Sequence, residues 1–304
     1  MEEHELIDKR GHYVFKVSPV AVYRHYFPFR FEAPVCSGHS KSGEWGSELS
    51  DNEAYLRGCR MRRAMVEKLE CNMYGKDCYI LTLTYAREYL GSHNYQPAVS
   101  DIGNFFKTFQ RLYPSDLFRY VWVGEVGTRG TKRIHFHCVL IDPPLLPVSG
   151  KDRLTRLWKS PDTGIVHRPR YKEGPFKQVF KDLWGKGFVD IRPVGKERED
   201  VLRSAHYFGK YFTKENGLMK WNVRLTGSSV NMEKYEVYSD MKCSPGVFAE
   251  VCEIVKKGFG LLKLVALSFQ KKYEGDPDGM VAFQRDVWLL TDKFHGLPPP
   301  RYSI

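Results

Sequence analysis

The feature that most limits the fold of this chain is a pair of strand-like runs joined by a short turn-like segment. The first run is FRYVWVGEV (118–126) and the second is KRIHFHCVLI (132–141). Both runs are rich in aliphatic and aromatic residues, which favour strands, and the segment GTRGT between them contains glycine. The pattern predicts a β-hairpin that turns about residue 129.

Other periodic runs predict the elements around this hairpin. CYILTLTY (78–85) alternates as a strand does, with Thr82 and Thr84 on one face. FKDLWGKGFVDIRPV (180–194) indicates a short helix, a glycine turn and a further strand. Helices are predicted from residue 51 to about 70, at 100–113 with a Ser-Asp cap, and at 197–215. Residues 142–180 are proline-rich and are predicted to form a long loop or insertion.

We divide the chain into three parts. Residues 1–50 are interpreted as strands and loops, 51–215 as the folded core, and 216–304 as an extension packed on that core. Within the extension we expect a helix after Pro245 and then a mixed amphipathic helix over the last fifty residues.

Composition narrows the class of protein. The 304 residues include 47 Lys+Arg and 36 Asp+Glu, which gives a net charge of +11. This excess attracts polyanions, and nucleic acid is the first partner to consider; the alternative is a solvated basic surface. A hydrophobic content of 42% excludes wholesale disorder.

Cysteine usage and hydropathy indicate the compartment. The seven cysteines are odd in number and irregularly spaced, so we expect no disulfide scaffold and a reducing cytoplasm. The acidic N-terminal segment MEEHELIDKR is unlike a secretory signal, and no charge-free run reaches the roughly 18 residues of a membrane span.

The second strand of the hairpin carries two histidines at a spacing that suits a metal ion. His135 and His137 are two residues apart, so they share a face of the strand. With a turn about residue 129, Glu125 pairs with Arg133 and lies diagonal to His135 on the same face. Two imidazoles and a carboxylate leave positions open on a divalent ion, Mn²⁺ or Mg²⁺. The alternative is a pair of histidines packed in the sheet, and a one-residue slip would move Glu125 to the other face.

The helix at 197–215 carries two tyrosines outside its apolar face. Tyr207 and Tyr211 share a basic stripe with Lys210, Lys214 and Arg203, whereas the apolar residues gather on another face. One interpretation is that the tyrosines border the core with solvated hydroxyls. The other is nucleophilic attack on phosphate, with Lys210 and Lys214 supplying positive charge and holding the DNA backbone.

An ordered set of motifs resembles a known family. The chain has GCRMRRAMVEKLE, CYILTLTY, VGEVG, RIHFH, LWGKGFVDI, HYFGKYFTK and EVYSDMKCSPG in this order, over about residues 55–247. This set resembles the rolling-circle replication initiators of the HUH endonuclease superfamily, and most closely the replication proteins of gokushovirus-type microviruses. Ile134 stands where that family commonly has proline. Cys36, His39 and Cys59 are spaced unlike a zinc site, so we expect no zinc.

The resemblance implies an α+β fold with a five-stranded antiparallel sheet, a central HUH strand and flanking helices. It implies nicking and joining of single-stranded DNA through a 5′-phosphotyrosine, with Tyr207 and Tyr211 as nucleophiles and His135, His137 and Glu125 on the metal. Arg133 and Arg203 are expected at the DNA. Thr82 and Thr84 either contact the DNA backbone or fill the sheet.

The expected partners are single-stranded origin DNA, a host DNA polymerase and, because no Walker motif is present, a host helicase. We expect a monomer or weak oligomer in the cytoplasm of a bacterial host. The alternatives are a transposase or plasmid initiator with the same site, and a non-catalytic basic module that binds single strands.

Overall fold

The computed structural model describes residues 12–27, 47–89, 95–126, 133–212, 218, 221–240, 243–257, 261–267, 284–294 and 296–297. The chain divides into two compact units, one formed by Ser42–Glu233 and the other by Met1–Lys41 together with Lys234–Ile304. The predicted core falls within the first of these units. The two ends of the chain, which we treated as separate segments, contribute strands to one sheet in the other unit.

The Ser42–Glu233 unit is built on a five-stranded antiparallel sheet in the order β8-β3-β5-β4-β9. Its strands are β3 (Cys78–Tyr85), β4 (Arg119–Val126), β5 (Ile134–Ile141), β8 (Gly187–Val194) and β9 (Thr226–Ser228). The histidine-bearing strand β5 is the central one. The predicted α+β class and its five-stranded antiparallel sheet are confirmed.

The register of the β4–β5 hairpin differs from the prediction by two residues. Glu125 pairs with His135 rather than with Arg133, and Val123 pairs with His137. The strands end at Val126 and resume at Ile134, so the connection is longer than the GTRGT turn that we assumed. A shift of two residues keeps every side chain on its face, and it places Glu125 directly opposite His135.

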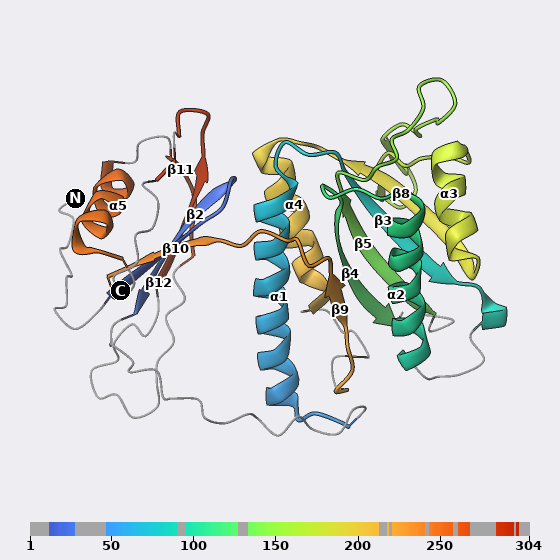
Figure 1. Cartoon of the computed structure of the whole chain (residues 1–304), viewed down its shortest axis with the longest axis horizontal. Coiled ribbons are helices and arrows are strands. Elements are labelled where there is room, and N and C mark those ends of the chain that lie inside the picture. The colour runs from blue at the N-terminus through green and yellow to red at the C-terminus, as the bar shows by residue number, and fades with distance from the viewer. Residues whose placement is uncertain are drawn as a thin grey trace. The chain divides into compact units, whose positions relative to one another are not determined.

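Helices cover both faces of this sheet (Figure 1). Helices α2 (Tyr95–Leu112) and α3 (Pro175–Trp184) lie on one face, and α1 (Asp51–Met73) and α4 (Arg198–Gly209) lie on the other. A 3₁₀ turn, η1 (Arg87–Tyr89), follows β3.

The helix boundaries have local causes. Ser50 caps α1 in a capping box with Glu53, at the predicted start. Helix α2 begins five residues before the predicted Ser-Asp cap, because Pro97 is tolerated in a first turn and because Tyr95 and Ala98 extend its buried face. Gly185 ends α3 in the left-handed conformation, with φ of 58°.

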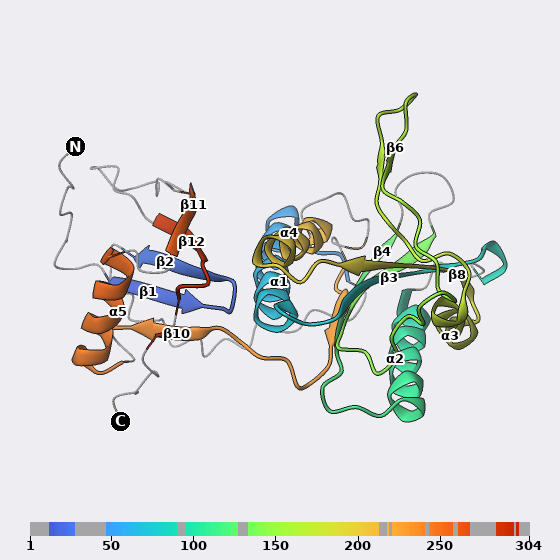
Figure 2. The same cartoon turned by 90° about the horizontal axis from the view of Figure 1, so that it is seen from above.

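The predicted loop at 142–180 contains regular structure. Strands β6 (Trp158–Lys159) and β7 (Val166–His167) pair in an antiparallel ribbon, and α3 begins at Pro175. Figure 2 shows the ribbon projecting from the body of this unit. The strand residues alternate only over two positions, which is too few for a sequence pattern to reveal.

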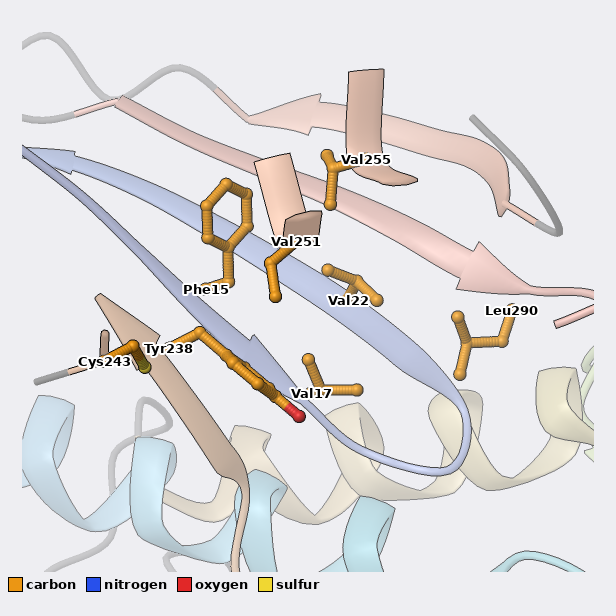
Figure 3. Packing of buried hydrophobic residues seen from close by; sticks show 8 residues of the cluster. All are labelled: Phe15, Val17, Val22, Tyr238, Cys243, Val251, Val255 and Leu290. Carbon is orange, nitrogen blue, oxygen red and sulfur yellow. The ribbon is translucent and has the colours of Figure 1, made fainter. Parts of the chain in front are cut away.

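The second unit has its own five-stranded sheet, in the order β10-β1-β2-β12-β11. The strands are β1 (His12–Val17), β2 (Ala21–Phe27), β10 (Glu236–Ser239), β11 (Leu261–Leu267) and β12 (Gln284–Leu290), and α5 spans Pro245–Lys257. Val251 and Val255 of α5 pack with Phe15, Val22 and Tyr238 of the sheet in a buried apolar cluster (Figure 3).

One prediction for this unit is wrong. The last fifty residues were expected to be largely helical, but their described parts include the strands β11 and β12. β12 pairs with β2 from the other end of the chain, and this long-range pairing favours the strand over the local helical pattern. The helix after Pro245 is confirmed. The terminal PPPRYSI, Cys36 and His39 lie outside the described residues.

Candidate active site

Two histidines and two threonines form paired contacts on the α1/α4 face of the sheet. Thr82 pairs with His137, and Thr84 with His135, across strands β3 and β5. The Thr84 Oγ1 lies 2.9 Å from Nδ1 of His135, and the Thr82 Oγ1 lies 3.3 Å from Nδ1 of His137. Both Nδ1 atoms are therefore hydrogen-bonded within the sheet, which leaves Nε2 of each ring to act elsewhere.

Glu125 reaches the same face from β4. Its Oε2 lies 3.0 Å from Nε2 of His137, although its backbone pairs with His135. The centroids of the two imidazole rings are 6.3 Å apart, and their planes are inclined by 22°. The structure thus brings the three predicted ligands, His135, His137 and Glu125, to one patch of the sheet.

The arrangement was tested as a metal site. Among the residues that the structure describes, no three or more His, Cys, Asp or Glu side chains form a group that could hold a metal ion. The donor types fit a divalent cation, since the set contains two imidazoles and one carboxylate. As the side chains stand, however, Glu125 is hydrogen-bonded to His137, and the three donors do not close around one point.

The surroundings of His135 favour its neutral form. Burial lowers the pKa of this imidazole first, and the positive charges of His137 and Arg133 lower it further, while Glu125 acts in the opposite direction. A neutral imidazole is the form that binds metals.

Tyr211 lies directly on this histidine patch. Its ring stacks on that of His137, with centroids 4.3 Å apart and planes inclined by 20°. Its hydroxyl donates a 3.2 Å hydrogen bond to the hydroxyl of Tyr207. Sequence motifs about 70 residues apart therefore meet in one site.

The two tyrosines differ in exposure, contrary to the prediction of a shared exposed stripe. Tyr207 is 43% exposed, whereas Tyr211 is 8% exposed. The α-helix ends at Gly209 and continues as the 3₁₀ turn η2 (Lys210–Phe212). Tighter winding after Gly209 breaks the predicted angular spacing and places Tyr211 among buried residues. The predicted apolar face of Val201, Ala205, Phe208 and Phe212 is buried, as expected.

The environment of Tyr211 keeps its phenol protonated. Burial raises the pKa of Tyr211 well above its ordinary value, and the hydrogen bond to Tyr207 and the charge of Glu125 add to this effect. The guanidinium of Arg192 lowers this pKa and is the positive charge that favours the Tyr211 phenolate.

Arg192 and its partner Asp190 are site residues that sequence reasoning missed. Asp190 pairs with Thr82 in the sheet, so it lies in line with His137 on the same face. Arg192 Nε lies 2.6 Å from Asp190 Oδ2, and this ion pair holds the guanidinium beside the site. Alternation in the strand GFVDIRPV indicates that the two charges share a face, but only the pairing of β8 with β3 shows that it is the histidine face.

A further missed residue is Phe188, which is opposite Thr84 on the edge strand β8 and is 60% exposed. The guanidinium of Arg133 lies 5.7 Å from the centroid of its ring, in a cation–π arrangement. The predicted DNA-binding residue Arg133 thus lies on the site face next to an exposed aromatic ring.

The remaining predicted residues have different environments. Lys210 is exposed on η2, one residue before Tyr211. Arg203 is exposed on α4 and forms an ion pair of 3.5 Å with Asp200 of the preceding turn. Lys214 lies outside the described residues.

Comparison with known proteins bears on the segment that carries this site. Residues 78–216 match the model of a family of replication-associated proteins, the ORF2 family. The matched segment includes the histidine strand, Glu125 and both tyrosines, and the match supports a rolling-circle replication initiator. No curated protein and no solved structure matches the chain. None of the helices in the described part of the chain combines the length and the apolar character that crossing a bilayer requires.

Proposed function

We propose that this protein is a site-specific endonuclease and ligase of single-stranded DNA that initiates and terminates rolling-circle replication through a 5′-phosphotyrosine. The observation that carries the proposal is the stacking of Tyr211 on His137, with the hydroxyl of Tyr207 in hydrogen-bonding contact with that of Tyr211. Two phenols thus lie beside two imidazoles on one face of a sheet, which is an arrangement for nucleophilic attack on phosphate. The family match supports the same role in replication.

The proposed reaction is a transesterification. A tyrosine oxygen attacks the phosphorus of one phosphodiester, the bond from phosphorus to the 3′-oxygen breaks, and the 5′-phosphate becomes esterified to the tyrosine. The phenol proton is transferred to the leaving oxygen, which becomes the 3′-OH that a polymerase extends. The number of phosphoester bonds is unchanged, so no nucleotide cofactor has to be hydrolysed.

We assign the first cleavage to Tyr207 and the second to Tyr211. Tyr207 is accessible to DNA, and its oxygen accepts a hydrogen bond from Tyr211, which stabilises negative charge on it. Tyr211 is buried and has a raised pKa, so it is the poorer nucleophile in this state. Cleavage by the second tyrosine at the regenerated origin would allow the first adduct to be released as a closed circle.

His135, His137 and Glu125 would hold a divalent ion, Mn²⁺ or Mg²⁺, which when bound polarises a phosphate oxygen as a Lewis acid. The hydrogen bond between Glu125 and His137 would be exchanged for contacts with the ion. The chain's own residues supply the rest: Thr82 and Thr84 orient the imidazoles, and Arg192 contributes positive charge at Tyr211.

We further propose a replicon of the gokushovirus type, because the ordered motifs resemble that family. On this proposal the protein acts in the cytoplasm of a bacterial host as a monomer or weak oligomer, and host helicase and polymerase act at the fork.

The test uses the full chain, Mn²⁺ and a randomised pool of single-stranded DNA labelled at its 3′ end. The cleaved 3′ portion should migrate with the protein in a denaturing gel, and sequencing the trapped DNA should reveal one preferred site. The Tyr207→Phe/Tyr211→Phe double variant should form no adduct while binding the pool with nearly unchanged affinity. Good binding without any adduct for the wild type would contradict the proposal and favour a non-catalytic binding module.

A further inference from the structure

The ribbon between β5 and α3 is longer than its two short strands suggest. Leu154 bridges Tyr171, and β6 pairs with β7 in the same register, with Trp158 opposite His167. Backbone hydrogen bonds from Thr155 to Arg170 and from Ser160 to Ile165 extend this register in both directions. One antiparallel ribbon therefore runs from residues 154–160 to residues 165–171, a length of about 23 Å at 3.3 Å per residue.

The two faces of the ribbon differ in charge. Paired residues share a face, and successive residues alternate between faces. One face therefore carries five exposed cationic residues: Arg153, Lys159, Arg168, Arg170 and Lys172. The opposite face carries Arg156 and the stacked rings of Trp158 and His167, whose centroids are 4.9 Å apart. We call the first of these the basic face.

The basic face continues into a groove at the foot of the ribbon. This groove has a volume of about 700 Å³ and is lined by Lys151, Arg153, Arg170, Lys172 and Lys177, with Glu173 as its one acidic residue. Glu173 is itself neutralised by ion pairs with Lys177 and Lys181. Within the described residues, no acidic side chain lies within ion-pair distance of Lys159 or Arg168. Positive charge is therefore available along the ribbon and at its foot.

The basic face opens on the same side of the sheet as the histidines. Tyr171, on the opposite face of the ribbon, packs against Tyr79, whose side chain lies on the α2/α3 side of the sheet. Arg170, on the basic face, lies 4.0 Å from Asp190, which is in line with His137. A continuous path of positive charge thus leads from Arg192, beside Tyr211, through Arg170 and along the ribbon.

We propose that the basic face of this ribbon binds double-stranded DNA next to the single strand at the candidate active site. A two-stranded ribbon has the width that the major groove accepts, and five cations on one face neutralise phosphates. The basic face carries no aromatic side chain, whereas surfaces for single strands stack bases on exposed rings. The proposed function places the single-stranded segment at the tyrosines; the duplex would be a flanking helix or the stem of a DNA hairpin.

The experiment measures binding of the full chain to a labelled 20-bp duplex of arbitrary sequence and to a 20-nucleotide single strand, as a function of salt. Arg168→Gln removes one charge from the basic face, and Arg156→Gln removes one from the opposite face of the same ribbon. Arg168→Gln should lower duplex affinity about fivefold and reduce the salt slope by about one, with little change for the single strand. Arg156→Gln should change neither affinity by more than about twofold.

Both variants should melt at the wild-type temperature, because both positions are exposed. The Lys159→Gln/Arg168→Gln double variant should reduce the salt slope by about two. Equal effects of Arg156→Gln and Arg168→Gln, or a loss confined to the single strand, would overturn the proposal. Neither measurement involves cleavage, so a protein that fails to form a tyrosine adduct would refute the proposed function without affecting this result.

Discussion

The ring of Tyr211 lies on the imidazole of His137, with 4.3 Å between centroids, and its hydroxyl donates to Tyr207. Stacking on the central strand fixes one phenol, while the other remains accessible at the surface. This asymmetry suggests that the two tyrosines are not interchangeable.

Single tyrosine variants should separate their roles. Tyr207→Phe should reduce formation of the first covalent adduct by about 10³-fold or more, because the accessible nucleophile is lost. Tyr211→Phe should still form the first adduct but should not complete joining. The measurement is the yield of protein-linked DNA and of ligated product, with DNA affinity as the control. A first adduct that depends on Tyr211 and survives Tyr207→Phe would reverse our assignment.

Local patterns predicted the parts of this site that lie on single elements. Alternation placed Thr82 and Thr84 on one strand face, and the spacing of His135 and His137 placed both imidazoles together. The hairpin register was two residues off because it depends on the length of the connection, which a strand pattern does not contain. Glu125 remained on the right face only because the shift was even.

Long-range pairing explains what the sequence did not predict. Arg192 and Phe188 join the site because β8 pairs with β3, which lies about 100 residues earlier in the chain. The strand β12 was mistaken for helix because its partner β2 is at the opposite end of the chain. In both cases the deciding contact is tertiary and overrides local propensity.

The threonine hydroxyls should tune metal affinity through the imidazoles. Thr82→Val and Thr84→Val keep the side-chain shape but remove the oxygens that hold Nδ1 of His137 and His135. We expect each substitution to weaken Mn²⁺ binding by about tenfold or more, measured by calorimetry. Thr226→Val on β9 is the control, since it changes a threonine of the same sheet without touching either histidine. Unchanged Mn²⁺ affinity in both test variants would show that the threonines only fill the sheet.

Gly124, on the other face of the hairpin, should be intolerant of a side chain. A Cβ at Gly124 would overlap the hydroxyl oxygen of Tyr95, so Gly124→Ala should lower the free energy of unfolding by about 3 kcal/mol. Gly103→Ala on α2 meets nothing within 4 Å and should instead raise it by about 0.5–1 kcal/mol. Denaturant unfolding of both variants checks this contrast, and a Gly124→Ala protein as stable as the wild type would contradict the packing.

The same pocket makes a second prediction about Tyr95. Its hydroxyl is buried and has no hydrogen-bond partner among the described residues. Removing an unsatisfied buried oxygen relieves a desolvation cost, so Tyr95→Phe should raise the free energy of unfolding by about 1 kcal/mol. A loss of stability in the same unfolding measurement would indicate that the hydroxyl is hydrogen-bonded in solution.

Phe188 should act as a stacking platform for a base next to the scissile phosphate. Its exposed ring lies beside Thr84 on the histidine face, and the Arg133 guanidinium covers part of it. Base stacking on an aromatic ring contributes about 1–3 kcal/mol, so Phe188→Ala should weaken single-strand binding about tenfold. Phe188→Trp should preserve it. Because no charge is lost, the salt slope should stay constant for Phe188→Ala, whereas Arg133→Gln should reduce it by about 0.7. Fluorescence anisotropy with a short oligonucleotide measures both quantities; a Phe188→Ala protein that binds as the wild type does would place the bases elsewhere on the site.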